Sequence, residues 1–345
     1  MEFYIFNDSR QLAGVMDYSK SSIWTPRYND VGDFELQIPA SEEVFELMKE
    51  DYYVTRLDDD MVGIIERVLL ISDEELGSFV YASGRDAKCI LERRIIWAQT
   101  NLSGTVEDCI RQLITENIIS PTDPNRVIPN FILGERKGFE EKMEMQVTGD
   151  NLLDVVTKIC KSHGMGFSVT FENKQFVFSL YKGADRSYRQ SVNPRVMFAP
   201  EFDNVIKMEY ESNIMTMKNV ALIAGEGEGV NRKTATTGIA SGLSRRELYV
   251  DARDISTNEN EIDTSTYNAL LIERGNEKLA EHPAIALFSG QVEPSVNYVY
   301  KQDYFVGDII QIKNEHGISA VSRIAEMIEC EDDNGYSVVP TFEEV

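Results

Sequence analysis

The residue types that most often carry chemistry are few and scattered in this chain. It has three histidines, His163, His282 and His316, and four cysteines, none of which form a Cys-x-x-Cys pair. Zinc sites need Cys and His clustered at short spacing, so we expect no metal site. A hydrolytic triad would need one of these histidines, and the chain has no Gly-x-Ser-x-Gly elbow. We therefore expect no catalytic residue, no cofactor and no enzymatic activity.

The cysteines are expected to be reduced and structural. Cys109 and Cys160 fall on the apolar faces of predicted helices. A buried thiol behaves as a small apolar side chain. The expected role is packing.

Two acidic runs and one glycine-rich run offer weaker chemical signals. Asp58–Asp60 and Glu331–Asp333 could hold a hard cation through carboxylate oxygens, but neither has EF-hand spacing, and we interpret both as solvated hairpin tips. The run Gly225–Gly229 resembles a phosphate loop, yet its two glutamates would repel phosphate. We expect a flexible loop over Gly225–Gly242 that orders against a neighbouring subunit, if it has a use.

One compact basic and aromatic cluster is present, formed by Arg93, Arg94 and Trp97. Two positive charges are too few for a nucleic-acid surface. We interpret the cluster as a contact with an acidic neighbour at a subunit or partner interface, with Trp97 as a candidate hot spot.

The overall charge excludes several classes of function. With 58 acidic and 34 basic residues, the formal net charge is -24, which opposes both nucleic-acid binding and docking on anionic membranes. Either self-repulsion for solubility or a wall past which DNA slides would explain it. No apolar run reaches about 20 residues, so no membrane insertion is expected. The start lacks signal-peptide features, so we expect synthesis in a cytoplasm.

The predicted elements change in type along the chain. Residues 1–97 have the short alternating runs of β-strands, with a helix over Glu42–Lys49 that Ser41 caps. Residues 98–200 have the pattern of a small α/β module. Residues 201–345 return to strands.

Three longer helices are predicted after the first region. Thr105–Ile119 carries apolar residues at helical spacing. A second helix follows Thr148 or Asp150 as its cap. A third, over residues 264–281, is stopped by Pro283.

A weak internal repeat links the first region to the last. Ile309–Lys313 is followed by a polar turn, a long strand, an acidic turn ending in glycine and another strand, and Val54–Leu57 is followed by the same order. The repeat aligns Arg67 with Arg323, each before an apolar run. The alternative is that any two β-hairpins share this order. Duplication would give two β-barrels, each with an accessory helix, and three chains would then form six equivalent barrels.

Several runs resemble one known family across essentially the whole chain. These are Gly307–Ile312, Arg323-Ile324, Tyr336, Asn29–Leu36 and Ser83–Ile96. They are similar to siphophage and prophage tail hub proteins and to the N-terminal hub region of tail-associated lysins. The resemblance implies a β-rich α+β fold with two tail-tube-like antiparallel β-barrel domains, 1–97 and 201–345, the second including the helix 264–281, and the α/β module 98–200 between them.

The resemblance also implies a function and partners. It implies a homotrimeric, pseudo-sixfold baseplate hub at the virion tail tip that closes or extends the tail tube, with DNA only in transit. The implied neighbours are the distal tail protein and the C-terminus of the tape-measure protein, with a separate spike, fibre or lysin. Assembly would take place in the bacterial host cytoplasm. A β-rich adhesin that binds a receptor or carbohydrate, and a tail-associated cell-wall hydrolase, are the alternatives.

Overall fold

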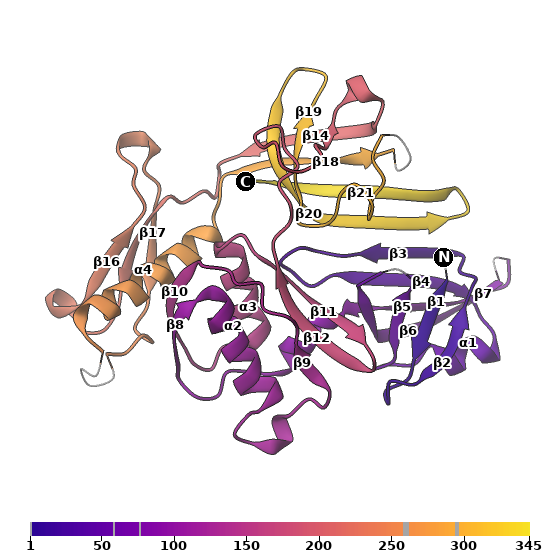
Figure 1. The fold of residues 1–345 in the computed structure, drawn as a ribbon, viewed down its shortest axis with the longest axis horizontal. Helices are drawn as coiled ribbons and strands as arrows, with labels where there is room; N and C mark the ends of the chain where they lie inside the picture. Colours follow the sequence, from indigo (N-terminus) through magenta and orange to yellow (C-terminus); the bar gives the residue numbers. More distant parts are fainter. Residues whose placement is uncertain (1, 58, 76, 258–261, 294–296) are drawn as a thin grey trace.

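The computed structural model describes residues 2–57, 59–75, 77–257, 262–293 and 297–345. The chain folds as a β-rich α+β protein, and its described residues form four hydrophobic cores. Two of the cores belong to β units at the chain ends, and two belong to smaller modules between and beside them (Figure 1).

The N-terminal β unit contains seven strands in the order β3-β4-β7-β6-β5-β1-β2. Their bounds are β1 Phe3–Phe6, β2 Leu12–Met16, β3 Ser21–Thr25, β4 Asp33–Pro39, β5 Tyr53–Arg56, β6 Val62–Asp73 and β7 Gly77–Asp86. The predicted short helix is α1 (Glu42–Leu47), and the Ser41 hydroxyl accepts the Val44 N–H at 3.2 Å, as expected for its cap. Trp24, Phe34 and Leu36 alternate inward to form the core.

A middle module follows, with two small sheets and two helices. Its elements are the 3-10 helix η1 (Ala87–Arg93), β8 Thr100–Thr105, α2 Val106–Ile114, β9 Phe131–Leu133, β10 Lys142–Val147, α3 Leu152–Ser162, β11 Gly166–Glu172 and β12 Gln175–Tyr181. The first predicted helix is confirmed, because α2 continues as a π-helical turn over Thr115–Ile119. Its core includes Val62 and Ile64 of β6, so the module packs directly on the N-terminal β unit.

The predicted cap of the second helix is wrong by one residue. The Asn151 side chain, rather than Thr148 or Asp150, accepts the Leu153 N–H at 2.9 Å. Asp150 is held elsewhere, because its carbonyl accepts the Ile96 N–H at 2.9 Å. Because of this contact with Ile96, the helix begins after Asn151 and not after Asp150.

The C-terminal β unit has the order β14-β18-β21-β20-β19-β13. Its bounds are β13 Met197–Phe198, β14 Val205–Asn213, β18 Ile285–Val292, β19 Ile309–Lys313, β20 Ser319–Asp332 and β21 Gly335–Glu344. Between β14 and β18 the chain forms a separate module of β15 Val220–Ala224, β16 Thr234–Thr237, β17 Glu247–Asp251 and α4 Thr264–Ala280.

Helix α4 confirms the third predicted helix, and Asp263 caps it. It packs mainly on β15, β16 and β10 rather than on the strands of the C-terminal β unit. β16 also falls within the segment expected to be a flexible loop, and the Arg232 guanidinium donates to the carbonyl oxygens of Gly225 and Ala224 at 3.0 and 2.9 Å. Part of that loop is therefore an ordered β-hairpin.

The two β units share one continuous sheet. β3 of the N-terminal unit pairs antiparallel with β20 of the C-terminal unit, and in Figure 1 the indigo and yellow strands lie side by side. Among the described strands the pairing is an open path from β14 to β2, without a closed barrel.

The predicted repeat is visible in the strand order of the two units. β3-β4-β7-β6-β5 corresponds to β14-β18-β21-β20-β19. Both long hairpins carry one irregularity, after Ile65 in β6 and after Ile324 in β20. Phe34 pairs with Gly84, the partner of Ile65, and Phe288 pairs with Phe342, the partner of Ile324. The two phenylalanines are therefore equivalent, and both are buried.

This correspondence corrects the alignment of the arginines. When the irregularities are matched, Arg67 is equivalent to Glu326 and not to Arg323. The predicted order of elements is right, but the predicted residue alignment is wrong. It matched two runs in which an arginine precedes apolar residues, and these runs are not equivalent in the structure.

Candidate functional site

The two β units are joined by an antiparallel strand pairing that extends beyond β3. Residues 20–28 face residues 325–333 in antiparallel register, with Trp24, Ile23 and Ser22 opposite Glu329, Cys330 and Glu331. The Tyr28 N–H donates to the Ala325 carbonyl at 2.9 Å, and the Met327 N–H donates to the Pro26 carbonyl at 3.1 Å. The two units are thus joined through main-chain hydrogen bonds along a sheet edge.

A buried ion cluster fastens this junction. Arg56, at the end of β5, lies between Asp59 and Glu329, and its Nη2 lies 2.6 Å from the Glu329 carboxylate. Lys301 lies 2.7 Å from Asp59 and 2.9 Å from Glu329. The side chains of Arg56, Asp59 and Glu329 are 7%, 5% and 5% exposed. Two cations therefore neutralise two carboxylates from different β units, and all of these groups except Lys301 are buried.

The electrostatics of the cluster follow from burial and pairing. Burial opposes ionisation of Asp59, and Arg56 and Lys301 outweigh it, so the pKa of Asp59 is lowered. Burial likewise disfavours the charged Arg56, but Asp59 and Glu329 raise its pKa. Asp59 is therefore not a solvated hairpin tip, as the sequence suggested, and Asp58 lies outside the described residues.

Tyr28 lies where the N-terminal unit, the middle module and the C-terminal unit meet. Its fully buried ring lies beneath the Arg323 guanidinium, 4.8 Å from the ring centre, and its hydroxyl donates to the Gly164 carbonyl at 3.0 Å. Gly166 and Gly307 allow this approach, since a Cβ on either would lie 2.3 or 2.5 Å from the ring. The tyrosine fixes the relative position of three parts of the chain.

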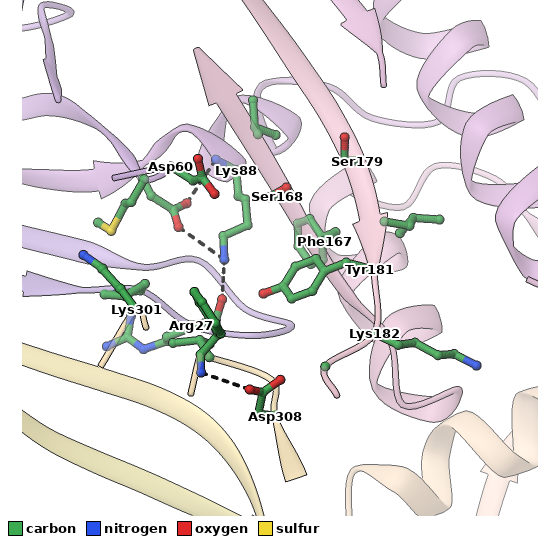
Figure 2. A pocket seen from close by; sticks show the side chains of 18 of the residues that line it. Arg27, Asp60, Lys88, Phe167, Ser168, Ser179, Tyr181, Lys182, Lys301 and Asp308 are labelled. Carbon is green, nitrogen blue, oxygen red and sulfur yellow. Dashed lines mark hydrogen bonds and ion pairs between the residues drawn. The ribbon is translucent and has the colours of Figure 1, made fainter. Parts of the chain in front are cut away.

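A cavity of about 650 Å³ opens beside this meeting point (Figure 2). Several of its charged side chains already have partners. The Lys88 ammonium donates to the Arg27 carbonyl at 2.7 Å and lies 3.2 Å from Asp86. Arg186 lies 2.6 Å from Asp308. Because these charges neutralise one another, the lining is suited to holding the three parts together.

The predicted cluster of Arg93, Arg94 and Trp97 lies on the surface, away from the junction. Arg93 pairs with Asp51 at 3.0 Å, and Arg94 donates to the Arg126 carbonyl at 2.9 Å. The structure adds Arg126, which the sequence analysis missed: its guanidinium lies 4.7 Å from the centre of the Trp97 ring.

Trp97 is 61% exposed and borders a second cavity of about 540 Å³. Burial, together with the charges of Arg126 and Arg93, lowers the pKa of Arg94. The three arginines therefore form a positive patch on an acidic protein. The loop between α2 and β9 brings Arg126 to Trp97, and no sequence signal marks that approach.

Three of the cysteines and His163 are held in structural roles. Cys89, Cys109 and Cys160 are buried, and burial raises the pKa of the Cys109 thiol to about 11, so these thiols are poor nucleophiles. His163 caps the end of α3 and lies 3.9 Å from Glu273.

Within the described part of the chain, no three His, Cys, Asp or Glu side chains gather in a way that could hold a metal ion. No helix there is both long and apolar enough to cross a membrane.

The junction residues that matter most, Tyr28, Arg56 and Lys301, were missed by sequence reasoning. Arg56 and its partner Glu329 are far apart in the chain, and each sits in an ordinary strand pattern. Only the pairing of β3 with β20 brings them together.

Comparison with known proteins places these features in a family. The family model described as Siphovirus ReqiPepy6 Gp37-like protein matches residues 2–342. A search of curated proteins finds no match.

Solved structures share the fold at low identity. The 43 kDa tail protein of prophage MuSo2 from Shewanella oneidensis superposes with a TM-score of 0.63 at 15% identity, covering 100% of this chain and 98% of that one. A tail protein from Neisseria meningitidis MC58 gives 0.61 at 16% identity, with 99% and 95% coverage. The prophage tail protein gp18 from Listeria monocytogenes EGD-e gives 0.58 at 11% identity, with 99% and 94% coverage.

Proposed function

The chain belongs to the Siphovirus ReqiPepy6 Gp37-like family of phage tail proteins, and from that premise we propose that it is a structural hub of the tail tip. Three copies form a ring in which each β unit takes the part of one tube-type β-barrel. The ring closes or extends the tail tube, and DNA passes through it.

The observation that carries this proposal is the edge-to-edge joining of two equivalent β units in one chain. Each chain supplies two units with the same strand order, so three chains supply six. A contact that already joins two equivalent units can be repeated between chains, and repetition around an axis closes a ring. This arrangement would match a threefold component to a sixfold tube.

The charge of the chain supports passage of DNA without binding. The net charge is -24, and DNA carries one negative charge per about 1.7 Å. A lumen lined by acidic or neutral side chains would not retain it. A lumen lined by Lys and Arg in the assembled ring would refute this part of the proposal.

The proposed partners are other tail components. The resemblance of the sequence supports the distal tail protein, the tape-measure C-terminus and a separate spike, fibre or lysin as neighbours at the virion tail tip, with assembly in the host cytoplasm. The exposed patch of Arg93, Arg94 and Trp97, now with Arg126, is proposed as a contact for an acidic partner surface.

The role is structural and not enzymatic. The buried thiols have raised pKa values, and His163 is used at a helix end. These groups are explained by packing, which supports a protein whose work is assembly.

One observation favours a second function. Trp97 presents an exposed ring beside a cavity that Asn117, Asp123 and Arg126 also line. Such an aromatic and polar groove suits a sugar, as in an adhesin. Binding of host glycans to the wild-type chain, lost in Trp97→Ala with assembly unchanged, would favour this function.

The assembly itself is tested by native mass spectrometry and sedimentation over a range of protein concentrations. We expect single chains and trimers, with the trimer fraction rising with concentration. Dimers or tetramers as the main species, or single chains alone at the highest soluble concentration, would overturn the hub proposal.

A further inference from the structure

Several sheet edges in the described part of the chain lack a partner strand, among them the outer edge of β2, and two of these edges are equivalent to edges of the internal junction. One is the outer edge of β14, which pairs only with β18. The other is the distal half of β6, which pairs with β7 on one side but leaves β5 after Ile64. Unpaired N–H and C=O groups along such edges are templates for another strand.

These two edges are the equivalents of the two that form the internal junction. Matching the irregularities of the hairpins makes residues 66–74 of the N-terminal unit equivalent to 325–333 of the C-terminal unit. Matching the pairs formed by Phe34 and Phe288 makes residues 206–214 equivalent to 20–28. The lengths agree, since β14 spans Val205–Asn213.

We propose that β14 of one chain pairs antiparallel with residues 66–74 of a second copy and so repeats the internal junction between chains. The equivalence fixes the register: Tyr210 lies opposite Leu70, Glu209 opposite Ile71 and Met208 opposite Ser72. This inference rests on the proposed ring and names the strands that close it.

The composition of the two edges fits this pairing. Leu70, Ile71, Ile206 and Tyr210 are large apolar side chains, each at least 40% exposed in the single chain. Exposed apolar residues on a free strand edge invite association. In the proposed register Leu70 and Tyr210 lie directly opposite each other, and such cross-strand pairs stabilise a sheet. Ile71 and Ile206 lie opposite Glu209 and Glu74, whose side-chain stems would cover them.

Two pairs of opposite charge fall together in the same register. Continuing the antiparallel pairing places Lys207 of β14 opposite Asp73 of β6. It also places Arg67 diagonally across from Glu211, within reach of a long side chain. A shift of one residue would turn every side chain to the other face and lose both pairs.

The occupant is a second copy because the internal junction already shows this contact between equivalent units. The two edges differ from each other, so each chain offers one of each and the contact runs head to tail. Alternation of the internal and the external junction would place all β units in equivalent surroundings. A closed ring follows if the turn per chain is one third of a circle.

Cysteine pairing tests the register directly. Ile23 lies opposite the native Cys330 in the internal junction, and their equivalents in the external junction are Glu209 and Ile71. Cα atoms directly opposite in antiparallel strands lie about 4.5–5.5 Å apart, which suits a disulfide. Ile71→Cys with Glu209→Cys, in a Cys330→Ser background, is the test variant.

Two matched variants control the test. Ile23→Cys with native Cys330 should form a disulfide within one chain and confirm that the geometry permits the bond. Ile71→Cys with Tyr210→Cys, in the Cys330→Ser background, places the thiols on opposite faces and should cross-link at least tenfold less. In one chain β6 and β14 are separated by six strands of the sheet, so the test pair can react only between chains.

The readout is non-reducing electrophoresis after mild oxidation of concentrated protein, together with native mass under reducing conditions. Covalent trimers from the test variant, reversed by reductant, are the expected result. Trimers by native mass without the cross-link would overturn the junction and leave the hub proposal standing. Cross-linked open chains longer than three would support the junction and overturn the closed ring. Single chains in both assays would overturn both.

Discussion

Replacing Arg56 by methionine removes the cation that faces two buried carboxylates at the junction of the β units. Methionine keeps much of the side-chain length, so packing over the Trp24 ring, 5.0 Å away, is largely preserved. Asp59 and Glu329, each 5% exposed, are left with Lys301 between them. Breaking a buried ion pair by removing one partner costs about 3–5 kcal/mol of unfolding free energy. Because Lys301 still neutralises part of the carboxylate charge, we expect a loss at the lower end of this range, about 3 kcal/mol.

The loss is measured as the change in unfolding free energy by urea titration, with Arg93→Met as the matched control. Arg93 also pairs with an aspartate, at 3.0 Å, but both side chains are about half exposed or more. Exposed pairs contribute about 0–1 kcal/mol. If Arg56→Met and Arg93→Met destabilise equally, the ion cluster does not hold the junction together.

The same variant has a predicted pH dependence. In the wild type the cationic partners of Asp59 lower its pKa, although burial opposes this shift. The ionised carboxylate therefore stabilises the folded state at pH values above the pKa of Asp59 in the unfolded chain. This stabilisation is lost as the pH falls through the pKa of Asp59 in the folded chain. Without Arg56 the Asp59 carboxylate loses a cation that lowers its pKa, so it protonates more easily. The difference between variant and wild type should therefore be largest at pH 7 and shrink toward pH 4, and a constant difference would refute the reasoning.

Three further predictions concern other positions. Burial raises the pKa of Glu277 to about 7, although the charge of Arg274 opposes this rise, so this side chain favours folding while it is protonated. The stability of the wild type should therefore fall as the pH rises from about 4.5 to 7. In thermal melts Glu277→Gln should remove that fall and be more stable than the wild type by at most about 3 kcal/mol at pH 8. A variant with an unchanged pH profile would contradict this. Gly166→Ala places a Cβ 2.3 Å from the Tyr28 ring and should cost about 1–3 kcal/mol by overpacking; a urea midpoint equal to that of wild type would show that the ring can move. In native protein a thiol reagent should label Cys330 first, because the other three cysteines are buried; peptide mapping that finds Cys89 labelled earlier would contradict the packing described.

Local structure was predictable wherever residue type alone decides it. Ser41 as a cap, the amphipathic run that became α2 and the stop of α4 before Pro283 each depend on neighbours within a few residues. The order of elements in the repeat was predictable for the same reason, since turns and strands have local signatures.

Features set by distant contacts were not predictable from one sequence. From the sequence, Asp59 was interpreted as part of a solvated acidic tip. In the structure the Lys301 ammonium lies between Asp59 and Glu329 of β20. The cap at Asn151 depends on contacts with a distant segment, since Ile96 donates to the Asp150 carbonyl and Ile95 forms a bridge with the extended Asn151. The patch around Trp97 needed Arg126 from another loop, and its use as an interface stays a prediction.

The register of the repeat shows the same limit. Arg67 and Arg323 matched by letter, whereas the strand irregularities match Arg67 with Glu326. Main-chain geometry, which the sequence does not display, decides which residues are equivalent.

A reconstruction of the assembled protein by cryo-electron microscopy tests the central claim most directly. The account predicts three chains around one axis and six β units in similar surroundings, joined alternately by β3 with β20 and by β14 with β6. A particle in which the N-terminal and C-terminal β units occupy unrelated positions, or in which the chains meet through other elements, would contradict it.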